Sequence, residues 1–238
     1  MNAFLCIGHR GAAGHEPENT LRSIRKALEL GAQGIEVDVR RALDGELVII
    51  HDATFKRTAG APGYVAKKTY PEIALLNAGH GEKIPRLRDV LHSIAEWRDN
   101  QGNGSQVVLN LELKSRGIAH QVTEEIIRAV ESGKWRFEDI VISSFDRKEL
   151  ASVKDHRLRI GVLVARRPMS LKKIAERFRA KSIHIPLRIA TQRFVDKAHA
   201  AGLKVYVFTV NTPDEIQRLR NLGADGVFTD FPDRVTGR

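Results

Sequence analysis

The sequence is poor in cysteine, in aromatic residues and in long hydrophobic runs. Cys6 is the only cysteine among 238 residues, which excludes an internal disulfide and a cysteine-based zinc site. No apolar run approaches the roughly 18 to 20 residues that a membrane-spanning helix needs. The N-terminal apolar stretch ends at Ile7 and is too short and too uncharged for a secretory signal. We therefore expect a soluble protein of the cytoplasm.

Other absences narrow the class of protein further. The chain has no Gly-x-Ser-x-Gly stretch, and Cys6 lies among apolar residues, so we expect no serine or cysteine nucleophile. Aromatic residues total 6%, and no base-stacking platform is visible. Hydrophobic residues make up 42% and charged residues 29%, a balance that excludes a disordered or collagen-like chain. Without a linker rich in proline, glycine or serine, we predict a single domain over residues 1–238.

Positive charge is abundant and unevenly distributed. The formal net charge is +10, and residues 147–204 alone hold 16 basic and 4 acidic side chains. Such a basic region attracts nucleic acid, an anionic membrane surface or a phosphorylated substrate, or is simply a solvated basic face.

Short β-rich runs alternate with stretches of helical periodicity along almost the whole chain. This alternation indicates a parallel sheet, and at this length it favours a (β/α)8 TIM barrel. A doubly wound open sheet would prefer a glycine-rich phosphate loop after its first strand, which is absent here. The predicted strands are residues 4–7, 34–39, 107–113, 139–143, 159–164, 182–185, 204–209 and 224–229. The clearest predicted helices are residues 20–30, 87–97, 118–131, 191–200 and 213–221.

Two segments depart from this alternation. Residues 41–45 are too short for a crossover helix, and Asp44-Gly45 is a strong hairpin turn, so residues 47–50 should run antiparallel to residues 37–39. Residues 53–85 lack clear periodicity, and we interpret them as an insertion over one end of the barrel. Residues 102–105 are predicted to form a flexible loop.

Three carboxylates are predicted to meet inside the barrel. Glu36 and Asp38 lie two residues apart on one strand, so both face the interior near the carboxyl end of that strand. Glu112 and Lys114 repeat this arrangement on the next parallel strand. Carboxylates in such proximity repel one another and raise each other's pKa. A divalent cation with oxygen ligands, Mg²⁺ or Ca²⁺, relieves the repulsion, and we predict that the three carboxylates bind one.

Two histidines are predicted at the same rim. His9 ends the first strand, and the hairpin returns His51 to about the level of Asp38. Imidazoles titrate near neutral pH and serve as general base and general acid. Arg10 and Lys114 can hold anionic oxygens. Together with a metal, this set suits cleavage of a phosphodiester.

The ordered motifs resemble those of the glycerophosphodiester phosphodiesterase family. Those motifs are His9-Arg10-Gly11, Pro17-Glu18-Asn19-Thr20, Glu36-x-Asp38, His51-Asp52, Glu112-x-Lys114 and Phe208-Thr209-Val210-Asn211. The resemblance implies a TIM barrel with an insertion after the second strand. It also implies metal ligation by Glu36, Asp38 and Glu112 and acid–base roles for His9 and His51.

The resemblance further implies a reaction. In the family reaction a glycerol hydroxyl attacks phosphorus, and water then opens the cyclic phosphate, giving sn-glycerol 3-phosphate and an alcohol. We assign His9 as the base of the first step and His51 as the acid, although the two roles can be exchanged.

Two departures from the family pattern bear on the substrate. Phe208 stands where the family commonly has a larger aromatic residue, which affects how the glycerol moiety packs. Residues 77–85 look shorter than usual, and a more open mouth would admit a lysophospholipid. A lysophospholipase D activity is therefore one alternative. A non-catalytic binder of nucleic acid or of an anionic surface is another, supported only by the basic stretch, and of these two partners we favour a weak membrane-surface contact.

Several other residues are assigned from their positions along the chain. Asn19 is expected to cap the following helix, with a supporting role at the site left open. Residues 143–145 end a strand at the active face and can touch substrate. His184 belongs to a group of histidines, without a partner pattern, that we expect in the core or at the surface.

Overall fold

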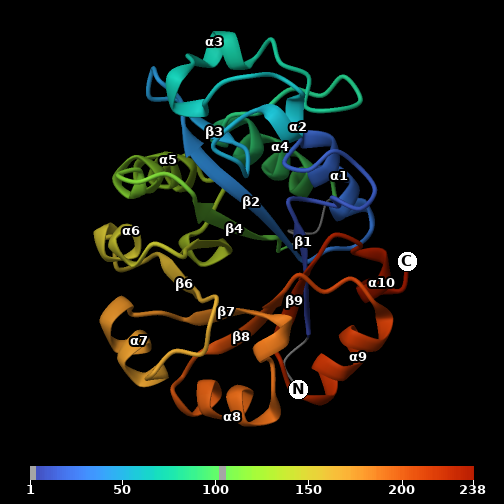
Figure 1. Ribbon diagram of the computed structural model, residues 1–238, viewed down its shortest axis with the longest axis vertical. Coiled ribbons are helices and arrows are strands. Elements are labelled where there is room, and N and C mark those ends of the chain that lie inside the picture. Colours follow the sequence, from blue (N-terminus) through green and yellow to red (C-terminus); the bar gives the residue numbers. More distant parts are fainter. Residues whose placement is uncertain (1–3, 102–105) are drawn as a thin grey trace.

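A closed barrel of eight parallel strands forms the centre of the protein (Figure 1), in a computed structural model that describes residues 4–101 and 106–238. Around the barrel the strand order is β1, β9, β8, β7, β6, β5, β4 and β2, and pairing of β1 with β2 closes it. The predicted (β/α)8 TIM barrel is therefore confirmed. Its strands are β1 (Leu5–His9), β2 (Gly34–Arg41), β4 (Val108–Leu113), β5 (Ile140–Ser144), β6 (Arg159–Leu163), β7 (Ser182–Pro186), β8 (Lys204–Phe208) and β9 (Gly226–Thr229).

Helices surround the barrel and bury one face against it (Figure 1). In α1, for example, Ile24, Ala27 and Leu28 are buried at helical spacing. Threonine side chains cap α1, α8 and α9 by accepting hydrogen bonds from backbone N–H groups of the first turn. The helices are α1 (Leu21–Glu29), α4 (Leu87–Asn100), α5 (Ala119–Glu131), α6 (Arg147–Ser152), α7 (Leu171–Phe178), α8 (Gln192–Ala200), α9 (Pro213–Asn221) and α10 (Asp233–Thr236).

The alternation of side chains along β2 explains how the barrel holds both a core and a polar interior. Ile35, Val37 and Val39 are fully buried and belong to the hydrophobic core between strands and helices. Because successive side chains of a strand point to opposite faces, Glu36 and Asp38 point to the other side, into the barrel.

The predicted hairpin is confirmed. Strand β3 (Leu47–Ile49) pairs antiparallel with the end of β2, with Val39 opposite Ile49 and Arg41 opposite Leu47. Gly45 in the turn has φ +92°, a left-handed conformation that favours glycine.

The predicted insertion stands beside the barrel and does not lie over one end of it, since Figure 1 shows this segment beyond β3. It contains the short helices α2 (Lys56–Ala59), η1 (Val65–Lys67) and α3 (Tyr70–Ile73). Phe55, Val65, Ile73 and Ile84 pack with residues of the hairpin in a second hydrophobic cluster, so the segment is held laterally by its own core.

Three remaining expectations concern single features. The predicted loop at 102–105 lies outside the described residues. Among the helices that the structure describes, none is long and apolar enough to cross a membrane. Cys6 is a buried free thiol whose pKa is raised to about 12 by burial, which makes it unreactive.

Candidate active site

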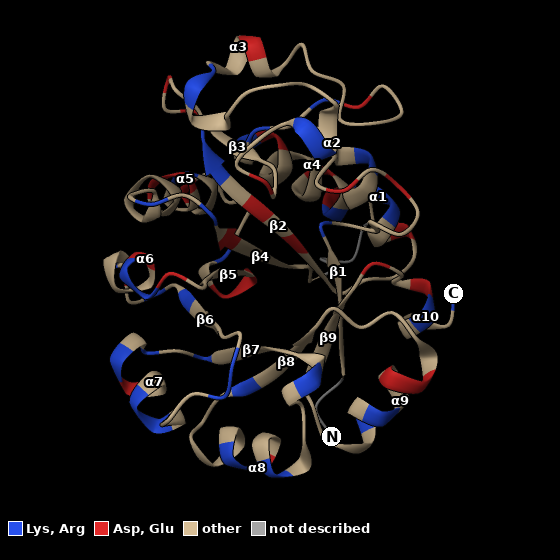
Figure 2. Ribbon diagram, in the orientation of Figure 1, with Lys and Arg blue, Asp and Glu red and all other residues tan. Residues whose placement is uncertain are grey.

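The three predicted carboxylates converge inside the barrel. Ligand oxygens of Glu36, Asp38 and Glu112 all lie within 4.8 Å of one another. Asp38 on β2 is in register with Glu112 on the neighbouring strand β4, and these acidic segments are marked red in Figure 2. All three side chains are buried. The sequence spacing therefore placed these groups on the same face of adjacent strands, as expected.

Burial and mutual repulsion give this cluster unusual electrostatics. Burial, followed by the charge of Asp38, raises the pKa of Glu36 to about 8. Burial also raises the pKa of Glu112, whereas Lys114 and Arg10 overcome burial at Asp38 and lower its pKa. Glu36 Oε1 is buried and has no hydrogen-bond partner among the described residues. An all-oxygen cluster with an unpartnered buried oxygen fits a hard divalent cation.

Two basic side chains lie against the carboxylates. Lys114 Nζ is 2.5 Å from Glu112 Oε1 and 3.3 Å from Asp38 Oδ1. Arg10 Nε is 3.2 Å from Asp38 Oδ2. With all three carboxyl groups ionised, as metal binding requires, they exceed the two cations by one negative charge. A divalent ion would reverse this to one excess positive charge, which matches the single negative charge of a phosphodiester.

The turn after β1 is shaped to hold the cluster. Arg10 has φ +55°, and its backbone N–H donates to Glu36 Oε2 at 2.9 Å. A Cβ on Gly11 would lie 2.4 Å from the Ser23 hydroxyl oxygen, so only glycine lets the turn pack against α1.

Asn19 does not cap the helix as expected. Thr20 is the N-cap of α1 and accepts from the N–H of Ser23, while Asn19 is buried with φ +59°. The Asn19 side chain instead donates to Asp38 Oδ2 at 2.8 Å and accepts from the Asp38 N–H at 3.2 Å. The supporting role that was left open for Asn19 is thus to hold the orientation of Asp38.

His9 is oriented by a carboxylate from the other end of the chain. Its Nδ1 lies 2.7 Å from Asp230 Oδ1, and Asn211 Nδ2 donates to Asp230 Oδ2 at 2.7 Å. Burial opposes the charged ring, but the hydrogen bond to Asp230 and the charge of Glu36 raise the pKa of His9 overall. This arrangement leaves Nε2 of His9 free of Asp230.

His51 forms a similar pair with its sequence neighbour. The hairpin brings it to the level of Asp38, because the N–H of Ile50 donates to the Asp38 carbonyl at 2.9 Å. His51 Nδ1 lies 2.7 Å from Asp52 Oδ1, and Arg57 joins Asp52 to Glu18. Burial, as the largest cause, lowers the pKa of His51.

One cavity of about 160 Å³ collects most of the predicted site residues. Its lining includes both histidines, Arg10, Lys114, Phe208, Glu36 and Glu112. Asp38 is not among the lining residues. Its carboxylate contacts the side chains of Asn19, Arg10 and Lys114. From the predicted stretch 143–145, Phe145 lines the cavity and meets the Phe208 ring edge to face at 6.0 Å between centroids.

Sequence reasoning missed several polar residues of this region. Asp230 follows β9 directly, and an acidic residue just after a barrel strand is a signal that could have indicated it. Asn110 and His184 also line the cavity, and His184 is buried beside Ser182 in the barrel interior. Their positions depend on strand register and had no motif to mark them. Arg57 comes from the insertion, where the sequence showed no periodicity.

A closed parallel barrel with titratable groups at the carboxyl ends of its strands is the arrangement of TIM-barrel enzymes. Here those groups are buried carboxylates, two imidazoles and two cations, a set suited to chemistry on a phosphate ester.

Comparisons with known proteins identify the family. Residues 9–234 match the model described as the glycerophosphoryl diester phosphodiesterase family. The chain is 34% identical over 242 residues to a glycerophosphodiester phosphodiesterase of Caldanaerobacter subterraneus subsp. tengcongensis, covering 97% of this chain and 96% of that protein. It is 35% identical over 252 residues to one of Bacillus altitudinis, covering 96% and 95%.

A solved structure gives the same result. A phosphodiesterase of Oleispira antarctica, in complex with the product sn-glycerol-3-phosphate, superposes with a TM-score of 0.87 and 30% identity, covering 98% of this chain and 95% of that one. The chain belongs to the glycerophosphodiester phosphodiesterase family and is an enzyme with phosphodiesterase activity.

Proposed function

We propose that this enzyme hydrolyses glycerophosphodiesters to sn-glycerol 3-phosphate and an alcohol, with a divalent metal and two catalytic histidines. The observation that carries the proposal is that two imidazoles, each bonded to its own carboxylate, line one small cavity with Glu36 and Glu112. The Oleispira antarctica structure with sn-glycerol-3-phosphate supports the identity of the product.

Glu36, Asp38 and Glu112 would hold the metal, with Mg²⁺ and Ca²⁺ both suited to their oxygen atoms. When bound, such an ion neutralises a phosphoryl oxygen and polarises phosphorus. Arg10 and Lys114 line the same cavity and would hold the remaining anionic oxygens by charge-assisted hydrogen bonds. Phe208, with Phe145 against it, would pack against the glycerol moiety.

His9 would act first as the base. Its Nε2 takes the proton of a free glycerol hydroxyl while that oxygen bonds to phosphorus and the bond to the alcohol oxygen breaks. His51 gives its proton to the leaving oxygen, and the product is a cyclic phosphate. In the second step water attacks phosphorus, His51 takes a proton from it, and His9 returns its proton to the released glycerol oxygen. Each proton transfer contributes about 10²- to 10⁴-fold in rate.

In the protein without a metal, the hydrogen bond to Asp230 and the charge of Glu36 raise the pKa of His9 against burial, whereas burial lowers the pKa of His51. A divalent ion on Glu36 would offset the second cause at His9, so the two roles are assigned by a separate test. Substrates with different leaving groups distinguish the two assignments. A p-nitrophenyl leaving group needs no general acid, so the variant lacking the acid should recover activity on glycerophospho-p-nitrophenol. The variant lacking the base should stay inactive on it. His9→Ala and His51→Ala are compared in this assay.

The activity is tested with purified protein and glycerophosphocholine in the presence of Mg²⁺, Ca²⁺ or Mn²⁺. Release of glycerol 3-phosphate that stops on chelation is expected, and His9→Ala and His51→Ala should each lose at least 100-fold. His15→Ala is the matched control. His15 lies in the loop that follows His9, but it pairs with Asp233 and does not line the cavity. Absence of turnover on every glycerophosphodiester with all three metals would refute the proposal.

Activity on a lysophospholipid gains no support from the cavity. At about 160 Å³ the cavity is smaller than the roughly 300–1,000 Å³ of typical ligand pockets, which suits glycerol phosphate and leaves an acyl chain outside. We propose deacylated glycerophosphodiesters as the substrates, because their glycerol phosphate group needs no space beyond this cavity for a chain.

A further inference from the structure

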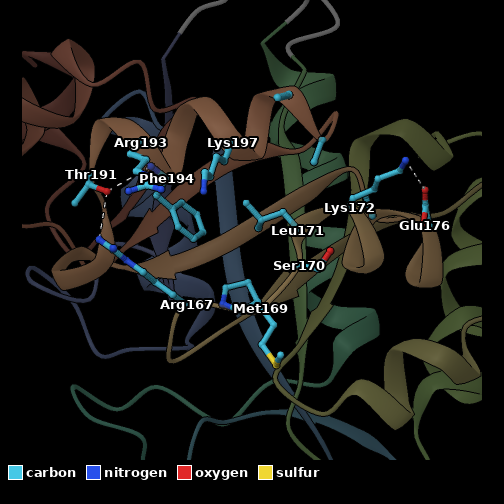
Figure 3. Close-up of a pocket in the computed structure, with 14 residues that line it drawn as sticks. Arg167, Met169, Ser170, Leu171, Lys172, Glu176, Thr191, Arg193, Phe194 and Lys197 are labelled. Carbon is cyan, nitrogen blue, oxygen red and sulfur yellow. Dashed lines mark hydrogen bonds and ion pairs between the residues drawn. The ribbon is translucent and has the colours of Figure 1, made fainter.

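A hollow of about 710 Å³ lies between α7 and α8, outside the active site. Figure 3 shows Arg193 and Lys197 projecting from α8 and Lys172 from α7, with Arg167 on the preceding loop. Leu171 and Phe194 form an apolar part of the lining. We call Arg167, Met169, Lys172, Arg193 and Lys197 the α7–α8 face.

Most cations of the α7–α8 face have no acidic partner. Within residues 4–101 and 106–238, Lys172 pairs with Glu176 at 3.9 Å, but no carboxylate lies within 4.0 Å of Arg167, Arg193 or Lys197. By contrast, Arg88 on α4 is paired with Glu46, and Arg57 in the insertion is paired with Glu18 and Asp52. Figure 2 shows basic residues on both α7 and α8, and residues 147–204 hold 16 basic against 4 acidic side chains. Unpaired charges of one sign create a field that reaches into solvent.

Apolar groups accompany these cations. Met169 is fully exposed, at 107% of its reference area, and Leu171 is partly exposed. A surface that joins basic side chains with exposed apolar ones matches the interface of an anionic bilayer, which accepts both. Nucleic acid fits less well, because the hollow's aromatic side chain, Phe194, is only 6% exposed and offers no stacking surface.

The α7–α8 face also has a particular position relative to the active site. The loops that lead into α7 and α8 begin at the carboxyl ends of β6 and β7. Because all barrel strands are parallel, these ends lie at the same rim as His9 and Phe145. The first residues of α7 and α8 therefore lie near that rim, so a membrane bound at this face would lie beside the entrance to the site.

We propose that the α7–α8 face docks the enzyme on an anionic lipid bilayer through its unpaired cations and Met169. Each cation near such a surface contributes favourably, and the contribution falls off within a Debye length, so the binding weakens as salt rises. The inference concerns attachment and does not depend on the reaction proposed above.

Vesicle co-sedimentation at 150 mM salt tests the proposal. The native protein should bind vesicles of phosphatidylcholine with 25% phosphatidylglycerol and should not bind pure phosphatidylcholine. The triple variant Arg167→Gln/Arg193→Gln/Lys197→Gln should bind on the order of 100-fold more weakly. Met169→Ser should weaken binding to a smaller extent, because it removes only the apolar contact.

A charge-matched control distinguishes binding through this face from binding that depends only on the net charge of the protein. Arg25→Gln/Lys67→Gln/Lys83→Gln removes the same net charge from exposed positions on α1 and the insertion, and its vesicle binding should stay within twofold of native. Both triple variants should hydrolyse dissolved glycerophosphocholine at the native rate if the protein has that activity. No binding to anionic vesicles, equal losses in the two triple variants, or tighter binding to duplex DNA through the same residues would overturn the proposal.

Discussion

His9 Nδ1 lies 2.7 Å from Asp230 Oδ1, a contact between residues 221 positions apart in the chain. Strands β1 and β9 are neighbours in the closed barrel, so the residues that follow their carboxyl ends meet at one rim. Because the Asp230 carboxylate accepts the Nδ1 proton of the ring, Nε2 is the nitrogen left to take or give a proton. Closure of the barrel therefore sets the tautomer of a candidate catalytic histidine.

Asp230→Asn should keep the fold and lower turnover by about 100-fold, because the ring loses the carboxylate that orients and charges it. The pKa of His9 should also fall, since the hydrogen bond that its ring donates to Asp230 raises it in the native protein. NMR titration of the His9 ring and kcat measured across pH check both effects. Asp233→Asn, which pairs with His15, serves as the control. An unchanged kcat would mean that Asp230 has no positioning role.

Glu36→Gln should abolish metal-dependent activity while raising stability in the presence of a chelator. The Gln carbonyl oxygen can take the place of Glu36 Oε2 and accept from the N–H of Arg10. The Gln NH₂ group then takes the place of Glu36 Oε1, which has no partner, and can donate to the neighbouring carboxylates. Because its pKa of about 8 makes Glu36 take up a proton on folding at neutral pH, replacing it with Gln removes that cost and should raise Tm by a few degrees, corresponding to about 1–2 kcal/mol. Thermal unfolding with EDTA measures this, and a clear fall in Tm would contradict it.

His184 should make the protein sensitive to mild acid. It is fully buried, and burial lowers its pKa to about 3, so between that value and 6.5 only the unfolded chain binds a proton there. Stability therefore falls as pH falls below 6.5, by about 2 kcal/mol between pH 7 and pH 5. Urea unfolding measures the free energy of unfolding at the two pH values. Its loss between pH 7 and pH 5 should be smaller for His184→Gln than for the native protein by this amount. The exposed His92→Gln should behave like the native protein.

Arg57→Gln should lower turnover by about tenfold without unfolding the insertion. Arg57 bonds to Asp52 at 2.7 Å and to Glu18 at 2.6 Å, and so fixes the carboxylate that orients His51. Arg57→Lys should recover only part of the rate, because an ammonium group cannot make the forked contacts. The exposed neighbour variant Lys56→Gln is the control, and an equal effect there would remove Arg57 from the site.

Local pattern was sufficient for most of the fold. The alternation along residues 34–39 predicted which side chains of β2 face the barrel, and Asp44-Gly45 predicted the hairpin that returns His51. These signals work because strand periodicity and turn conformation depend on neighbouring residues alone. The insertion was placed wrongly because its lateral position depends on packing of Phe55 and Ile73 against the hairpin, which no local pattern records.

The sequence by itself determined the class of barrel, the convergence of Glu36, Asp38 and Glu112, and the rim to which His9 and His51 belong. Only the tertiary structure decided which partners orient them. Closure of the barrel brings Asp230 next to His9. The Asn19 side chain binds Asp38 and does not cap the helix, and Arg57 of the insertion binds Asp52. Such contacts join residues distant in the chain, and their distances depend on strand register and packing that a linear sequence does not display.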